Sequence, residues 1–333
     1  MITVTLYSRA DCHLCDQARE DLKALQEEIP HSLVEIDIDT EPALQSAYAL
    51  EIPVVEVGPY RLKAPFTRRD LQVTIGAAVD RQAHLERIDD KAYRAAVAHG
   101  QTITGSDRFS YWSSKHYLAA LNFILLLYVG LPFLAPMFKQ IGANGAANVI
   151  YKIYSPLCHQ WGFRSWYLFG EQAYYPHAAA GIPGVKTFEE VTSITDANDP
   201  LRLAARDYQG NETAGFKVAL CQRDVAIWGS MLLFGLLFAV TGRRVKSLHW
   251  GAWILIGLVP AGIDGLSQVI SQLPLEAIHN ILPYRESTPF LRTLTGFFFG
   301  FATAWFGFPV VEETMADTRR FLVKKVSVVA ERK

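Results

Sequence analysis

The sequence predicts a chain of two unlike parts, an α/β domain over residues 1–80 and an all-α membrane domain with about four transmembrane helices after it. Three observations lead to this fold class. Segments with strand-like and helix-like patterns alternate in residues 1–80. Uncharged apolar runs of about 20 residues, the length that crosses a bilayer as a helix, recur from residue 117 onward. Most of the charged residues lie outside those runs, near the two ends of the chain.

The α/β part begins with residues 2–7, where β-branched and aromatic residues alternate as they do in a strand. A turn that carries two cysteines follows and leads into a helix that ends at Pro30. The remaining elements are a strand, a short helix, a strand and a helix, which we expect at 33–39, from 41, at 52–57 and at 67–79. Polar residues 81–114 are predicted to form a helical linker.

The cysteine pair lies at the predicted turn between the first strand and the first helix, in the sequence Cys12-His13-Leu14-Cys15. Backbone N–H groups and the dipole at a helix N-terminus stabilise a thiolate, so we expect Cys12 to be the nucleophile. Cys15 lies one turn further on, where it can attack a mixed disulfide on Cys12 and release the product. The alternatives are a structural pair, half of a zinc site, and a relict or regulatory domain.

The segment Tyr7-Ser-Arg-Ala-Asp-Cys-His-Leu-Cys-Asp16 resembles the glutaredoxin-like family, and the order of elements resembles the thioredoxin fold. The resemblance covers residues 1–80. It implies a cis proline before the third strand that faces the dithiol, and Pro53 occupies that position. It also implies that protein disulfides or glutathione disulfides are the partners, with glutathione as a candidate cofactor.

The membrane part has predicted spans at 117–137, 225–241, 249–270 and 289–311, a loop at 138–224 and a tail at 312–333. Lys and Arg gather on the cytoplasmic side of spans, so Arg243, Arg244 and Lys246 place the end of the second span in the cytoplasm. We therefore expect a bacterial cytoplasmic membrane protein with both termini in the cytoplasm and the loop outside. The chain begins without the pattern of a cleaved signal peptide, which agrees with a cytoplasmic N-terminus.

Reactive and charged residues cluster at the predicted outer ends of the spans. Asp264 lies inside a span, where an ionisable residue costs several kcal/mol unless it is paired or hydrated. The polar cluster comprises Arg164, Arg223, Asp264, Gln268 and Arg292, and beside it lie the candidate ligands Cys158, His159, Cys221 and Asp224. The motifs Cys-His-Gln, Cys-x-Arg-Asp and Asp-Gly-x-x-Gln resemble a family of predicted multi-pass bacterial membrane proteins of unknown function.

Three interpretations of this cluster remain open at the level of sequence. Cys158 and Cys221 could form a disulfide that exchanges electrons with a quinone or a protein. The four candidate ligands could instead bind a zinc-type metal through S, N, S and O donors, with Asp264 in reserve. In the third interpretation the cysteines are simply buried, and the Arg and Asp residues pair to hold helices together.

These patterns predict a membrane-anchored thiol–disulfide oxidoreductase, coupled to a membrane module of redox or metal-binding type. The alternative is a transporter or channel regulated by a thioredoxin-like domain. The 333 residues carry a formal net charge of −1, which provides no basic surface for nucleic acid. The lipid bilayer is the remaining expected partner.

Overall fold

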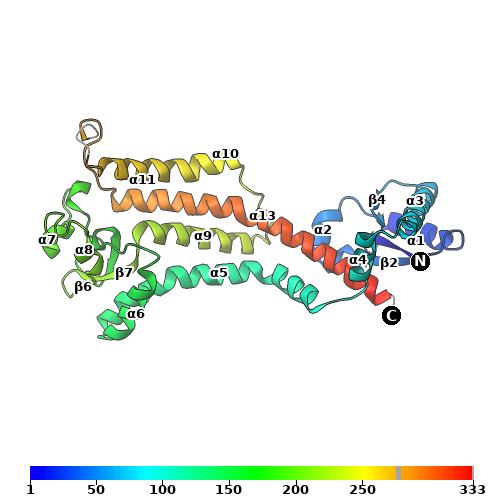
Figure 1. Ribbon diagram of the computed structural model, residues 1–333, viewed down its shortest axis with the longest axis horizontal. Coiled ribbons are helices and arrows are strands. Elements are labelled where there is room, and N and C mark those ends of the chain that lie inside the picture. Colours follow the sequence, from blue (N-terminus) through cyan, green and yellow to red (C-terminus); the bar gives the residue numbers. More distant parts are fainter. Residues whose placement is uncertain (275–278, 332–333) are drawn as a thin grey trace. The chain divides into compact units, whose positions relative to one another are not determined.

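The computed structural model describes residues 1–274 and 279–331, and the chain divides into two compact units (Figure 1). The first unit comprises Met1–Tyr117 with Glu313–Lys333, and the second comprises Leu118–Glu312. The first has an α/β fold, and four helices in the described residues are long and apolar enough to cross a membrane. The predicted fold class is confirmed. Residues 332–333 of the predicted tail lie outside the described residues.

A four-stranded sheet in the order β2-β1-β3-β4 forms the centre of the first unit. β1 is parallel to β2 and antiparallel to β3, and β3 is antiparallel to β4. The strands are β1 (Ile2–Ser8), β2 (His31–Asp37), β3 (Val54–Val57) and β4 (Tyr60–Lys63). The predicted order omits β4, whose polar, mostly exposed residues lack the pattern of a buried strand. Gly58, with φ of 56°, makes the turn that returns the chain into β4.

Helices cover both faces of this sheet. Helices α1 (His13–Leu25) and α3 (Arg68–Arg87) pack on one face, where Leu6 and Val55 are fully buried. The other face carries Tyr7 and Val54, and it is covered by the short segment η1 (Ile38–Thr40) and helix α2 (Pro42–Tyr48). Helix α3 continues beyond the predicted limit, and α4 (Lys91–Gly100) follows it within the predicted linker.

The predicted tail is helical through Glu331, because α13 runs without a break over Pro289–Glu331. Near its end, Val323 and Val328 pack against the same face of the sheet as α2. Lys324 Nζ lies 2.7 Å from the carboxylate of Glu56 on β3, which Arg61 also contacts at 2.6 Å. Burial alone would raise the pKa of Glu56, but these two cations outweigh it and hold that pKa below its usual value.

The second unit is built from long helices that lie side by side in the order α5, α9, α13, α11 (Figure 1). Ring contacts join Tyr128 to Trp228 between the first two and Phe234 to Phe301 between the next two. The helices are α5 (Gly105–Gln140), α9 (Gln222–Val240) and α13, and the fourth, Trp250–Ser271, includes α10 (Trp250–Trp253) and α11 (Val259–Ser271).

Small residues bring α13 and α9 into close contact. Gly296 and Gly300 are one turn apart on α13, and both face α9. A Cβ atom at Gly300 would lie 2.1 Å from the backbone oxygen of Ile227. Since lipid is as apolar as the helices, membrane helices associate through such close backbone packing.

A π-helical segment, η4 (Ile254–Leu258), lies between α10 and α11, directly before Pro260. The proline ring has no N–H to donate and crowds the preceding turn, so the regular α-helical hydrogen-bond pattern is interrupted there. The helical irregularity in this span therefore coincides with Pro260.

The chain between α5 and α9 contains more structure than the sequence predicts. Within the predicted loop at 138–224, the first element is helix α6 (Asn144–Tyr154), and Pro156 follows its end. A three-stranded sheet, in the order β5-β7-β6, and short helices form the rest of the segment. These elements are η2 (Gly162–Arg164), β5 (Ser165–Leu168), η3 (Ala178–Ala180), α7 (Phe188–Thr192), α8 (Leu203–Asp207), β6 (Gly210–Asn211) and β7 (Gly215–Cys221). The core of the segment between α5 and α9 contains Tyr167, Tyr175 and Phe188. These residues are too far apart in the sequence to show the periodicity of a helix or a strand.

Candidate functional site

The two N-terminal cysteines form a disulfide at the start of α1, with Cα atoms 5.2 Å apart. Cys12 is the N-cap residue, and its backbone oxygen accepts hydrogen bonds from the N–H groups of Cys15 and Asp16. Cys15 is fully buried, whereas Cys12 is half-buried. An external thiol or disulfide therefore has access to Cys12 and is excluded from Cys15.

Pro53 lies at the same edge of the sheet. Tyr7 on β1 pairs with Val54 on β3, so the residue before Val54 lies beside the end of β1 that leads to the cysteines. The Ile52–Pro53 peptide bond is cis. The sheet therefore brings Pro53 and the cysteine turn to one edge.

The negative charge of Asp16 at the start of α1 is neutralised by Arg19, a residue that the sequence analysis did not identify. Asp16 would oppose a thiolate in the first turn of α1, but Arg19 lies 2.6 Å from its carboxylate. The same guanidinium forms a bidentate pair with Glu35 of β2, at 2.7 and 2.6 Å, and lowers the pKa of Glu35. The spacing of Asp16 and Arg19, three residues apart on a helix, is the sequence signal for the first of these contacts.

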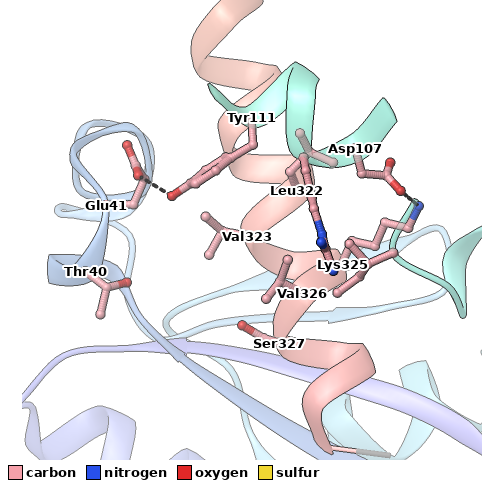
Figure 2. Close-up of a pocket in the computed structure, with 11 residues that line it drawn as sticks. Thr40, Glu41, Asp107, Tyr111, Leu322, Val323, Lys325, Val326 and Ser327 are labelled. Atoms are coloured by element: carbon pink, nitrogen blue, oxygen red, sulfur yellow. Dashed lines mark hydrogen bonds and ion pairs between the residues drawn. The ribbon is translucent and has the colours of Figure 1, made fainter. Parts of the chain in front are cut away.

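A cavity of about 300 Å³ lies elsewhere in the first unit (Figure 2). Its apolar wall is formed by Tyr111, Leu322 and Val326. At its two sides the Tyr111 hydroxyl donates to Glu41 at 3.3 Å, and Lys325 donates to Asp107 at 2.8 Å. Cys12, Cys15 and Pro53 are not among the residues that line it, so the cavity is separate from the dithiol.

In the second unit, Cys158, Cys221 and Asp224 bring their donor atoms together, all within 4.8 Å of one another. The Cys221 thiol donates to Asp224 at 3.0 Å, and the Cys221 backbone N–H donates to Cys158 Sγ at 3.3 Å. Both cysteines are free thiols. His159, the fourth predicted ligand, is exposed and packs its ring on Trp161 at 4.9 Å instead.

Gln160 and Lys217 hold the two cysteines next to each other. The Gln160 side chain donates to the backbone oxygens of Tyr151 and Ala219, at 3.0 Å each, so it joins α6 to β7. Lys217 is fully buried and donates to the backbone oxygen of Gln160 at 2.6 Å. Burial lowers the pKa of Lys217 to about 7.

The predicted polar cluster is a network of four arginines on two carboxylates. Glu286, whose side chain is 2% exposed, accepts a bidentate pair of bonds from Arg164 at 2.7 and 2.9 Å and also contacts Arg292. Gln268 donates to Glu286 at 2.8 Å and accepts from Arg292 at 3.0 Å. Arg292 and Gln268, which are far apart in the sequence, therefore share one buried carboxylate.

Asp264 is the second carboxylate of the network. It contacts Arg223, and it accepts hydrogen bonds from Arg285 at 2.9 Å and from Ser287 at 2.7 Å. Its side chain is 3% exposed. The cost of a charge inside a span is thus offset by two guanidinium groups and a hydroxyl.

Two family matches cover different parts of the chain. Residues 3–88 match the family described as glutaredoxin-like domain (DUF836), and residues 212–306 match the family described as predicted membrane protein (DUF2085). The chain joins a glutaredoxin-like domain to a predicted membrane protein domain. An uncharacterized protein of Methanocaldococcus jannaschii is 23% identical over 205 residues, which cover 60% of this chain and 94% of that protein. No solved structure matches the chain.

The membrane domain also contains site residues that the sequence analysis missed. Arg285, Glu286 and Ser287 all bind the predicted polar cluster, and Glu286 is one of its two buried carboxylates. The sequence feature that could have identified them is the Arg-Glu pair a few residues before the apolar run that begins at Pro289. In the glutaredoxin-like domain, the two cysteines and the start of the helix that carries them are adjacent in sequence.

Proposed function

We propose that this protein is a membrane-anchored thiol–disulfide oxidoreductase with Cys12 as the nucleophile and Cys15 as the resolving thiol. The observation that carries the proposal is the asymmetry of the pair at the N-terminus of α1, with Cys12 accessible and Cys15 fully buried. A redox role agrees with the glutaredoxin-like match, and the four apolar helices supply the anchor.

The reaction follows from this geometry. The Cys12 thiolate attacks one sulfur of a substrate disulfide, the S–S bond breaks, and the second substrate sulfur leaves as a thiolate. The Cys15 thiolate then attacks Cys12 Sγ, which forms the intramolecular disulfide and releases the first substrate sulfur. Two electrons pass from the dithiol to the substrate, and the structure corresponds to the oxidised product. A low-molecular-weight thiol of the glutathione class, or a protein dithiol, restores the reduced pair.

The test uses the full chain in detergent, because Val323 and Val328 of α13 cover the sheet of the redox domain and a short N-terminal fragment would lack them. We expect the reduced protein to reduce a small disulfide substrate, and Cys12→Ser to abolish this activity. Cys158→Ser is the matched control and should leave it unchanged. Activity that survives Cys12→Ser would remove the basis of the proposal.

We further propose that the membrane domain lies in the bacterial cytoplasmic membrane, with both termini in the cytoplasm and the three-stranded sheet outside. Arg243, Arg244 and Lys246 lie between α9 and α10, at the opposite end of α9 from Cys221. A membrane-impermeant thiol reagent applied to intact cells should label Glu212→Cys and leave Lys246→Cys unlabelled. The reverse result would invert the proposed orientation.

A further inference from the structure

We propose that Cys158, Cys221 and Asp224 bind a thiophilic cation of the zinc class through three protein donors. This site is independent of the Cys12–Cys15 pair, and it belongs wholly to the second unit. The proposal rests on the positions of the three donor atoms, on the hydrogen bonds that hold them and on the apolar shell around them.

The spacing of the donors suits a tetrahedral ion. Zn–S bonds of about 2.3 Å at tetrahedral angles put two sulfur ligands about 3.8 Å apart, and sulfur–oxygen separations are slightly shorter. The two sulfurs and the carboxylate oxygen here all lie within 4.8 Å of one another. Shifts of about 1 Å therefore bring the three donor atoms to ligand spacing.

The donors are also held on a rigid frame. Cys221 is the N-cap of α9 and Asp224 lies in its first turn, so the start of one helix fixes both. Cys158 comes from the segment after α6, and the amide of Gln160 ties that segment to β7, which ends at Cys221. Supporting hydrogen bonds of this kind orient metal ligands and increase affinity.

A proton now occupies the place that a cation would take. The Cys221 thiol donates to the Asp224 carboxylate at 3.0 Å. When a metal binds, both thiols lose their protons to solvent. The ion then replaces the Cys221 proton as the positive centre that attracts the Asp224 carboxylate. The backbone N–H of Cys221, which already donates to Cys158 Sγ at 3.3 Å, stabilises the thiolate that remains.

The site suits an ion that keeps one coordination position for an exchangeable ligand. Within residues 1–274 and 279–331, the group of mutually close donors has three members, and His159, which is exposed and packs on Trp161, is not one of them. Cys158 is 7% exposed among apolar neighbours that include Tyr151 and Tyr154, whereas Cys221 and Asp224 are half-buried, so water reaches the site from their side. Three protein ligands with a fourth position for water or an external ligand is the arrangement of catalytic rather than structural zinc sites.

The experiment measures metal bound to the full chain, purified in detergent with a reductant, after Cys12 and Cys15 have both been replaced by serine. We expect about one zinc ion per chain, and Co²⁺ in its place should show the sulfur-to-cobalt charge-transfer band of thiolate ligation. Cys221→Ser should abolish the band, and Asp224→Asn should weaken binding by about 10-fold or more. His159→Ala is the matched control and should keep both the ion and the band.

Three results would overturn the proposal. One is a metal-free protein in which mass spectrometry finds Cys158 joined to Cys221. Another is a metal content that survives replacement of both cysteines. A third is loss of the ion in His159→Ala, which would contradict the three-donor assignment. Because Cys221→Ser could disturb folding, the variants are compared by circular dichroism, and the Asp224→Asn result decides the case if Cys221→Ser is unfolded.

Discussion

Replacing Glu286 by Gln should destabilise the membrane domain far more than the same change at an exposed ion pair. The Glu286 carboxylate is 2% exposed and contacts two guanidinium groups, those of Arg164 and Arg292, which are 17% and 4% exposed. Gln keeps the shape but removes the charge, so two partly buried cations lose their shared partner. Breaking a buried pair in this way costs about 3–5 kcal/mol.

Glu171→Gln is the matched control. Glu171 pairs with Lys186 at 2.6 Å, but the two side chains are 51% and 59% exposed. Such exposed pairs contribute about 0–1 kcal/mol. The assay is unfolding in mixed micelles with increasing dodecyl sulfate, followed by tryptophan fluorescence. Equal losses of unfolding free energy for the two variants would refute the reasoning.

The Glu286 carboxylate also predicts a pH dependence. Burial raises its pKa, but the pairing with Arg164 and Arg292 outweighs burial, so the pKa in the folded protein is below the usual 4.5. A carboxyl group with a lowered pKa stabilises the fold fully above the unfolded value, and that contribution is lost as the pH falls through the folded value. Wild-type stability should therefore fall below about pH 4.5, and Glu286→Gln should show a smaller fall over the same range.

Three further variants test other parts of the structure. Gly300→Ala should lower the unfolding free energy by about 1–3 kcal/mol, because the added Cβ would meet the Ile227 backbone and push α13 away from α9. Gly229→Ala is the control and should leave the unfolding free energy unchanged, because the space around Gly229 is open. Lys217 has a folded pKa of about 7 against a usual 10.5, so wild-type stability should rise with pH between those values, and Lys217→Met should remove the rise in a pH series of unfolding curves. Cys15→Ser should accumulate a mixed disulfide on Cys12, detected as a mass increase that dithiothreitol reverses, and its absence would argue against the assigned resolving role.

The cysteine pair of the glutaredoxin-like domain could be predicted because its determinants are local. Cys12 and Cys15 are separated by one helical turn, and the strand before them and the helix after them are visible as patterns in a short window. The same is true of the four apolar helices, since length and composition alone decide whether a helix can cross a bilayer. Strand β4 was not predicted, because its mostly exposed residues carry no pattern of burial.

The site in the membrane domain could be predicted only in part. Cys158, Cys221 and Asp224 were expected together, and they lie together. His159 was expected with them as the nitrogen donor of a four-ligand set, but its exposed ring packs on Trp161 instead. Adjacency in sequence therefore did not give the direction of a side chain.

The sequence by itself determined that a glutaredoxin-like dithiol and four membrane-type helices belong to one chain, because periodicity, apolar length and cysteine spacing are properties of neighbouring residues. The tertiary structure decided which distant residues meet. Glu286 lies 122 positions from Arg164 in the sequence, and Lys324 lies 268 positions from Glu56. No local pattern encodes such pairings, because each depends on how whole helices pack, and charges are buried only where that packing brings a partner to them.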